Sequence, residues 1–360
     1  MIPLFSRGYD VLVNVTNICD ARCVMCNIWK NQEGPKSWLS PELMRSVGPL
    51  STVSFAGGEP FLHKQIVEIV RAVREKNPRT KVVFSSNGFR TEPILDKVRE
   101  ILEFHKNVQV TISLDGVGEV HDRIRGIPGA WTKVNRTFDR LGEIGLKQRN
   151  FAFTITRDNY SALPDVYAHA KSKGAGLSLA VAQSSKFLNV EIPPLEFEKV
   201  YPYLAPIVLA HLKSWNPMDW MRAFFQFGVL RYLATRQRPI ECDAFEHQFM
   251  IDQAGEVLSC HPLLLRAGNL GEKELPKILS CPVAEKLKKD LRTCHACWEV
   301  CTARSAIRTN LFKVGLWAVA NKVLAHLGLW DGRKGSLLFP LTRKKTERPT
   351  PNVQHPTSKG

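Results

Sequence analysis

The segment YDVLVNVTNICDARCVMC, residues 9–26, decides how the rest of the chain is interpreted. It opens with an apolar and mostly β-branched run, Val11 to Val15, which is typical of a strand that is buried on both faces. Three cysteines follow that run within eight residues, at positions Cys19, Cys23 and Cys26. The segment therefore predicts a buried strand followed by a loop that carries three thiols.

Five more apolar runs continue this pattern along the chain, and amphipathic stretches separate them. The apolar stripe over residues 63–76 is typical of a helix, and Ser40 before Pro41 is a helix-start signal. Repeated strand-then-helix units predict a parallel sheet, in which ligands gather beyond the carboxyl ends of the strands. The five runs are Thr52 to Phe55, Lys81 to Ser85, Val108 to Leu114, Phe151 to Thr156 and Leu177 to Val181.

The composition excludes several classes of protein. The chain has 360 residues, of which 44% are hydrophobic, and this is typical of a folded protein of one or two domains. Its nine cysteines are an odd number at short spacings, and the N-terminal residues MIPLFSRGYD lack the apolar run of a signal peptide. We therefore expect intracellular metal binding rather than a disulfide framework.

The formal net charge of +16 favours an anionic partner, such as nucleic acid, a phosphorylated substrate or an anionic membrane surface. No apolar stretch approaches the ~20 residues of a membrane-spanning helix. The nearest one, Leu311 to Trp330, is interrupted by Lys313, Asn321, Lys322 and His326. A spanning helix is therefore not expected.

The three clustered thiols favour an iron–sulfur cluster over zinc. A closed structural zinc site needs four protein ligands, and no fourth Cys or His lies nearby in the sequence. Cysteine thiolates also hold iron–sulfur clusters, and a cluster with three of them keeps one iron open for a substrate or cofactor. The CxxxCxxC spacing directly after a strand argues against three unrelated loop cysteines.

Over about residues 9–190 the chain resembles the radical S-adenosylmethionine (radical SAM) superfamily. The resemblance rests on CxxxCxxC and on three motifs that follow the next strands in order, namely GGEP at 57–60, SNG at 86–88 and SLDG at 113–116. It implies a partial (β/α)6 barrel, with a 4Fe-4S cluster on Cys19, Cys23 and Cys26. It also implies that SAM binds the fourth iron through its amino and carboxylate groups.

The resemblance further implies which residues contact SAM. In the family the GGEP motif, here Gly57, Gly58, Glu59 and Pro60, holds the methionyl amine. Glycines let the backbone approach a ligand closely, and carbonyls and a carboxylate accept hydrogen bonds from an ammonium group. A plain strand-to-helix turn accounts for the proline that opens the helix, but not for the glutamate before it.

Four more residues are SAM contacts by the same resemblance: Asn87, Ser113, Asp115 and Arg125. Ser113 is expected at the ribose or carboxylate, and Arg125 is expected to bind the carboxylate with its two-pronged guanidinium. The alternatives are a surface role for Arg125 and a turn-capping role for Asp115. Met25 stands where many members of the family have an aromatic residue, and it can fill the same apolar space.

Six further cysteines lie between about 240 and 305. This region resembles the SPASM/twitch type of C-terminal extension, whose cysteines ligate auxiliary iron–sulfur clusters, although the full SPASM pattern has more cysteines. We therefore expect one auxiliary 4Fe-4S cluster, with Cys281 as the spare. A structural zinc site is the alternative, because CxxC with two distant cysteines is also a zinc spacing. The predicted ligands are Cys242, Cys260 and members of the trio Cys294, Cys297 and Cys301.

The chain is divided by these patterns into five segments. Helix signals dominate after the barrel core, and residues Phe312, Leu316, Val319, Val323, Leu327 and Trp330 recur at helical spacing. The basic, proline-containing end is predicted to be disordered. The segments are a barrel core (1–190), a helical connector (191–239), the auxiliary cluster region (240–305), an amphipathic helix and connector (306–342) and the basic tail (343–360).

The expected function is that of a radical SAM enzyme served by an external electron donor such as flavodoxin or ferredoxin. We predict a cytoplasmic protein with peripheral membrane contact through its C-terminal helix, and an anionic or lipid-linked small molecule as its substrate. The alternative for this helix is that it packs on the barrel and that the basic tail is a solvated end. A peptide or protein maturase is the alternative, although the first strand begins near the N-terminus and leaves no room for a peptide-binding domain before it. A non-catalytic redox sensor or nucleic-acid-binding protein is a further alternative. Against it stand the SAM motifs and the lack of aromatics interleaved with basic residues.

Overall fold

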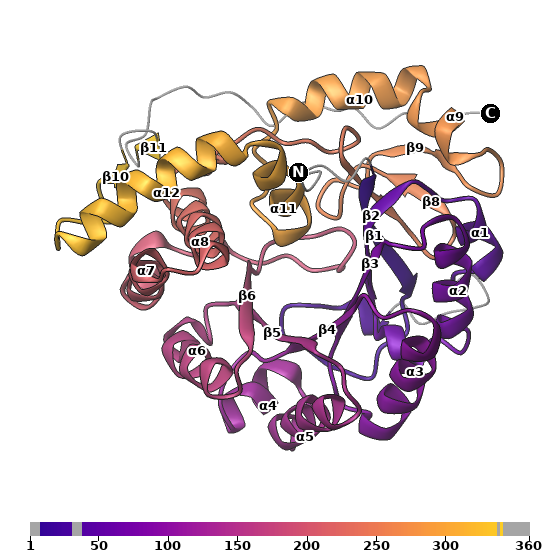
Figure 1. Cartoon of the computed structure of the whole chain (residues 1–360), viewed down its shortest axis with the longest axis horizontal. Coiled ribbons are helices and arrows are strands. Elements are labelled where there is room, and N and C mark those ends of the chain that lie inside the picture. The colour runs from indigo at the N-terminus through magenta and orange to yellow at the C-terminus, as the bar shows by residue number, and fades with distance from the viewer. Residues whose placement is uncertain (1–7, 31–37, 337–338, 341–360) are drawn as a thin grey trace.

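The computed structural model describes residues 8–30, 38–336 and 339–340. Its centre is a sheet of nine strands in the order β6-β5-β4-β3-β2-β1-β7-β8-β9, in which β1 to β6 run parallel (Figure 1). These six strands are β1 (Tyr9–Thr16), β2 (Leu50–Gly57), β3 (Lys81–Ser86), β4 (Val108–Ser113), β5 (Gln148–Ile155) and β6 (Gly176–Val181). The strands that extend the sheet beyond β1 are β7 (Gln248–Ile251), β8 (Glu256–Leu258) and β9 (Arg266–Asn269). A separate hairpin joins β10 (Gly335–Ser336) to β11 (Phe339–Pro340).

All six predicted strands are confirmed, and their ends differ from the predicted ones by at most three residues. The observed strands are longer mainly where polar residues take part in the ladder. β5, for example, begins at Gln148 because that residue pairs with Gln109 of β4. Apolar runs mark the part of a strand that is buried, whereas backbone hydrogen bonds continue through polar residues at its ends.

Helices cover the outer face of the parallel strands, which is the arrangement of a partial (β/α)6 barrel and confirms the predicted fold (Figure 1). The Ser40 hydroxyl accepts a hydrogen bond from the Glu42 amide at 3.3 Å, so the predicted N-cap is confirmed. The helices of this part are α1 (Pro41–Arg45), α2 (Ile66–Lys76), α3 (Thr91–Phe104), α4 (Glu119–Arg125), α5 (Ala130–Glu143) and α6 (Leu163–Ser172).

The barrel does not close by pairing β1 with β6, since β1 pairs with β7 on that side. Helix α11 (Val300–Thr309) instead contacts both β6 and β7 and lies across the gap between them (Figure 1). The C-terminal half of the chain therefore supplies one wall of the barrel. Its other helices are α7 (Phe197–Lys213), α8 (Pro217–Thr235), α9 (Leu275–Leu279), α10 (Pro282–Arg292) and α12 (Leu311–His326).

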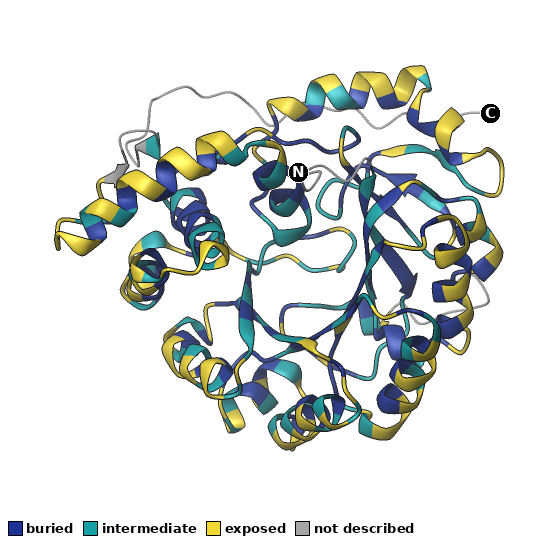
Figure 2. Cartoon of the chain, viewed as in Figure 1, coloured by how far each residue is buried: buried dark blue, intermediate teal, exposed yellow. Residues whose placement is uncertain are grey.

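The predicted C-terminal helix is confirmed as α12, but the face that it buries differs from the predicted stripe. Val314, Trp317 and Ala325 are among its buried residues, and the helix packs on α7 and α8. Five residues of the predicted stripe instead face outward, as the yellow surface of α12 in Figure 2 shows. We call this exposed set the apolar stripe, and it consists of Phe312, Leu316, Val319, Val323 and Leu327.

None of the helices in the described ranges is both long enough and apolar enough to cross a bilayer. The tail at 343–360, which we predicted to be disordered, lies outside the residues that the structure describes.

Candidate active site

The loop that carries the first three cysteines is fixed to the end of α4 by its backbone. The Arg22 amide donates to the Arg125 carbonyl at 3.0 Å, and the Val24 amide donates to the Ile124 carbonyl at the same distance. Gly126 ends α4 with a φ of 66°, and a Cβ there would lie 2.4 Å from the Arg22 carbonyl oxygen. Only glycine accommodates both this conformation and this close approach.

The three thiols lie in an apolar surrounding. Cys23 and Met25 are buried together with Ile124, and Phe89 and Val120 pack against this group. Met25 therefore fills apolar space beside the thiols, as predicted for this departure from the family pattern. Burial raises the pKa of the Cys19 thiol to about 12 and that of the Cys26 thiol to about 11. Such thiols become thiolates only when a cation or metal compensates for their burial.

Arg125 supplies a buried cation at this position. Its Nη2 pairs with the Asp115 carboxylate at 2.6 Å, and its Nη1 lies 3.4 Å from Cys23 Sγ. Arg125 is thus not a surface arginine, and Asp115 does more than cap a turn. Asp115 also accepts from the Thr154 amide at 2.7 Å, which ties the pair to β5. The predicted contact of Arg125 with a SAM carboxylate stays a prediction.

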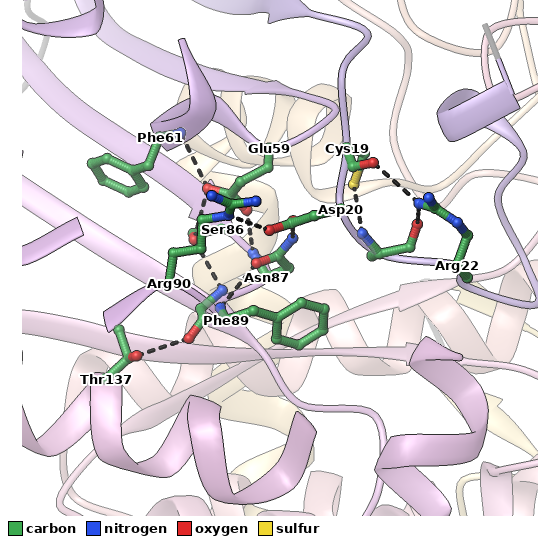
Figure 3. A network of polar contacts seen from close by, with 12 residues as sticks. Cys19, Asp20, Arg22, Glu59, Phe61, Ser86, Asn87, Phe89, Arg90 and Thr137 are labelled. Carbon is green, nitrogen blue, oxygen red and sulfur yellow. Dashed lines mark hydrogen bonds and ion pairs between the residues drawn. The ribbon is translucent and has the colours of Figure 1, made fainter. Parts of the chain in front are cut away.

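The Glu59 carboxylate is buried and joins the loops that follow β2 and β3 (Figure 3). One oxygen accepts from the Phe61 amide at 3.1 Å and from the Ser86 hydroxyl at 2.9 Å. The other accepts from the Asn87 amide at 2.7 Å. Burial raises the pKa of Glu59 to about 7, although these donors oppose the rise. The carboxylate that was predicted to accept from a ligand ammonium therefore already holds protein donors on both oxygens.

Asp20, inside the CxxxCxxC motif, extends this network to the cysteine loop (Figure 3). Its carboxylate accepts from Asn87 Nδ2 at 2.7 Å and from Arg90 Nε at 2.8 Å. Asp20, Ser86 and Arg90 were not predicted as site residues. The signal was their position inside or directly beside motifs already singled out, since neighbouring polar residues at strand ends meet at one edge of a parallel sheet.

The two glycines of GGEP are required by the protein itself. A Cβ at Gly57 would lie 1.6 Å from Asn14 Oδ1, and one at Gly58 would lie 2.1 Å from the Ile18 carbonyl oxygen. The loop after β2 thus packs against the loop after β1, and the Glu59 amide donates to the Ile18 carbonyl at 2.8 Å. Pro60 opens a short 3₁₀ helix, Pro60–Leu62, as predicted.

These residues fit a cluster and a SAM molecule by their donor chemistry. Three thiols on one loop leave a fourth ligand position for another molecule, and thiolates are the usual ligands of iron–sulfur clusters. Arg125 Nε is buried without a hydrogen-bond partner in the described part of the chain, so the guanidinium retains a donor for an anionic group. Among the described residues, no three Cys, His, Asp or Glu side chains converge closely enough to hold a single metal ion.

Four of the C-terminal cysteines form a second set of thiols. All four are buried, and burial raises the pKa of each. The pKa of each of these thiols is also raised by the charge of at least one other member of the set. They come from the segment after α8, from the end of β8 and from the segment after α10, and they are Cys242, Cys260, Cys294 and Cys297.

Arg238 is the buried cation of this second set, and the sequence analysis missed it. Its Nη1 donates to the Cys297 carbonyl at 3.1 Å and to Thr302 Oγ1 at 2.9 Å, and it lies 3.9 Å from Cys297 Sγ. The positive charge opposes the rise in pKa of Cys242, Cys294 and Cys297. A lone arginine in a basic chain gives no sequence signal of such a role.

The remaining two cysteines have other surroundings. Cys301, a member of the predicted ligand trio, lies on α11 at the wall of a cavity inside the barrel. Burial raises the pKa of its thiol, and the neighbouring Cys297 and Glu299 add to the rise. Cys281, the predicted spare, is the N-cap of α10, and its Sγ accepts from the Ala284 amide at 3.4 Å. Which cysteines bind a cluster stays a prediction.

Comparisons with known proteins agree with this geometry. The profile described as "Radical SAM superfamily" matches residues 13–169, which confirms the resemblance based on the motifs. The Fe-coproporphyrin III synthase of Methanosarcina barkeri is 31% identical over 45% of this chain and 41% of its own length. The mycofactocin maturase MftC of Mycolicibacterium smegmatis is 28% identical over 50% of this chain and 47% of its own length. The chain thus spans about half the length of these curated relatives.

A likeness to solved structures covers more of the chain. The structure of polyhistidine-tagged anSMEcpe with bound AdoMet has a TM-score of 0.60 at 15% identity, over 87% of this chain and 99% of that one. At this identity the likeness shows the fold alone.

Proposed function

We propose that this chain is a radical SAM enzyme, which cleaves SAM reductively and abstracts a hydrogen atom from its substrate. The observation that carries the proposal is the network at the carboxyl ends of β1 to β3. Glu59 and Asp20 join the GGEP, SNG and cysteine loops there by direct hydrogen bonds. A bound 4Fe-4S cluster would supply the electron that converts SAM into the 5'-deoxyadenosyl radical.

The chain's own residues would bind and orient the cluster and SAM, and they would exclude water from the site. Cys19, Cys23 and Cys26 would hold the cluster, and Arg125 would offset the negative charge of the thiolates and of a SAM carboxylate. Glu59 holds the GGEP and SNG loops in one arrangement before a ligand arrives, so little reorganisation is needed on binding. Helix α11 contacts β6 and β7 across the gap in the barrel and would limit the entry of water there.

The second set of thiols, together with Arg238, supports an auxiliary 4Fe-4S cluster, and a structural zinc site is the alternative. An auxiliary cluster would carry an electron from the product radical or bind the substrate directly. Reduction of the first cluster needs an external electron donor such as flavodoxin or ferredoxin.

The test is anaerobic reconstitution with iron and sulfide, followed by dithionite and SAM. We expect roughly eight irons per chain, the content of two four-iron clusters, and formation of 5'-deoxyadenosine. Roughly four irons with one zinc and intact SAM cleavage would replace the auxiliary cluster with a zinc site. Failure of the reconstituted protein to bind SAM would overturn the enzyme proposal.

For the substrate we propose an anionic or lipid-linked small molecule. The net charge of +16 supports an anionic partner, and the synthase relative is named for a small-molecule product. A peptide is the second candidate, and the relative named as a mycofactocin maturase supports it. A non-catalytic sensor is the least supported of the candidate functions, because a sensor has no need of the SAM motifs.

We also propose that α12 contacts an anionic membrane through the apolar stripe. Phe312 is 79% exposed and Leu327 is 65% exposed, and α12 has no acidic residue. At one end of the helix Trp215 is 78% exposed, and the Lys322 ammonium lies 4.2 Å from its ring centroid. An exposed apolar face flanked by lysine and tryptophan is typical of helices that lie in the membrane interface.

Flotation with vesicles tests this contact. We expect the protein to float with phosphatidylglycerol-containing vesicles, and the double variant Val319→Asp/Val323→Asp to stay at the bottom. Val283→Asp is the matched control, because Val283 is also an exposed valine but lies on α10. Equal flotation of the double variant would refute the contact. A dimer that the double variant dissociates would assign the stripe to a second copy of the chain.

A further inference from the structure

The interior of the barrel holds a cavity of ≈ 220 Å³, and none of the residues that line it belongs to the four motifs. Hydroxyl groups line the strand side of the cavity, and they belong to Ser54, Ser85, Thr111, Thr154 and Ser178. Helix α11 forms the other side with Cys301 and Arg304. Residues of β1 to β7 line the cavity, and the carboxyl ends of β1 to β4 carry the SAM motifs, so the cavity and the proposed SAM site belong to one barrel.

Arg304 is the residue of this cavity without an evident structural role. Within the described part of the chain its guanidinium has neither a hydrogen bond nor an ion pair. Its helix neighbour Arg308 differs, since Arg308 Nη2 pairs with the Asp10 carboxylate at 2.6 Å. Arg238, the other arginine buried in this region, has acceptors for its donors. None of the Arg304 nitrogens is among the fully buried unpaired atoms of the described residues, so its N–H donors face the open space of the cavity and are available to a ligand.

The charges around Arg304 do not balance. Burial and the positive charge of Arg304 lower the pKa of Lys81, and burial also lowers the pKa of Arg304 itself. Asp10 is the carboxylate that acts on Arg304, but it already pairs with Arg308. Of these groups only Arg304 and Asp10 line the cavity, and Asp10 is already paired, so an anion bound in the cavity would offset the charge of Arg304.

We infer that the barrel cavity is the substrate site and that Arg304 binds an anionic group of the substrate, a carboxylate or a phosphate. The guanidinium fork matches both groups in geometry, and hydroxyl groups supply further hydrogen bonds. The inference rests on the proposed function, because it takes the molecule in the cavity to be the substrate of the radical. It adds the anchoring residue on α11 and the chemical group that this residue recognises.

The experiment titrates the reconstituted protein, by calorimetry at constant ionic strength, with inorganic phosphate and separately with acetate. We expect one of the two anions to bind and so to identify the group. Binding should weaken about tenfold or more in Arg304→Met, since loss of a charge-assisted pair costs roughly 1.5–3 kcal/mol. Arg99→Met is the matched control on the exposed surface of α3, and it should bind as the wild type does.

Equal affinities of the wild type and Arg304→Met, or no binding of either anion by the wild type, would overturn the inference. If Arg304→Met does not fold, phenylglyoxal labelling of the wild-type chain replaces it. Protection of the Arg304 peptide by the anion would then support the site, and unprotected labelling would refute it. SAM binding measured on the same samples separates the two proposals. A protein that binds the anion but not SAM contradicts the enzyme, whereas one that cleaves SAM without using Arg304 contradicts only the inference.

Discussion

The two sets of thiols are built in opposite ways. The first comes from one loop of eight residues and carries its spacing in the sequence. The second comes from three separate segments, and Cys242 and Cys297 are more than fifty positions apart. Their buried cations differ as well, because Arg125 pairs with the Asp115 carboxylate whereas Arg238 donates to a carbonyl and a hydroxyl. A local motif thus identifies one site, and only folding assembles the other.

The two sets of thiols are also held in place by different neighbouring segments. The first loop is held by neighbours within the barrel, namely the end of α4 and the loops after β2 and β3. The segment that carries Cys294 and Cys297 is held on α8, where the Tyr232 hydroxyl donates to the Ala296 carbonyl at 2.7 Å. We therefore expect each set to be lost separately, and the following variants test that separation.

The largest effect is expected from Cys23→Ala. Removal of one of three ligands should abolish the first cluster and reduce formation of 5'-deoxyadenosine to background, while the auxiliary metal stays bound. Iron analysis together with product detection checks this. Cys281→Ala is the control, since Cys281 caps α10 and lies outside both sets. Retention of SAM cleavage by Cys23→Ala would show that another residue replaces this ligand.

Cys297→Ala should have the next largest effect, confined to the second set. We expect the loss of roughly four irons per chain, or of one zinc if the site is structural, with SAM binding retained. Metal analysis and electron paramagnetic resonance of the reduced protein distinguish the two metals. Loss of SAM binding in this variant would mean that the two sets are not independent.

Glu59 should make the stability of the metal-free protein depend on pH. Because burial raises its pKa to about 7, the folded chain keeps a proton that the unfolded chain loses near pH 4.5. The free energy of unfolding should therefore fall by roughly 3 kcal/mol as the pH rises from 4.5 to 7. Urea unfolding across this range measures the slope. Glu59→Gln should remove this dependence of the free energy of unfolding on pH, whatever the absolute stability of the variant. Glu92→Gln on the exposed surface should retain the dependence.

Arg238→Gln should have the smallest effect, on the second set alone. Loss of a positive charge beside the thiols should make the reduction potential of an auxiliary iron–sulfur cluster more negative. A redox titration followed by electron paramagnetic resonance measures this shift. Arg236→Gln is the control in the same segment, because Arg236 is exposed and should leave the potential unchanged. An unchanged potential in Arg238→Gln would contradict the role of this cation.

Much of the fold could be predicted because the middle of each barrel strand is mostly buried and apolar. Such stretches appear in the sequence as short apolar runs, and all six were identified. The face of α12 could not be predicted in the same way. This helix has apolar residues on both sides, so helical spacing alone does not tell which side packs on α7 and α8.

The candidate site likewise contains residues that could be predicted from the sequence and residues that could not. Motif residues such as Glu59 and Arg125 could be identified, but their partners within the protein could not. Asp20, Arg238 and Arg304 were missed because a single charged residue has no periodicity or spacing that distinguishes it from a surface charge.

By itself the sequence determined the class of fold and the position of the first thiol loop, because apolar runs and a short cysteine spacing are local properties of the chain. Only the tertiary structure decided which distant cysteines meet, which face of α12 stays exposed and that Arg304 lines the barrel cavity. These features depend on contacts between segments far apart in the sequence. Burial and electrostatic pairing, which such contacts create, have no local pattern.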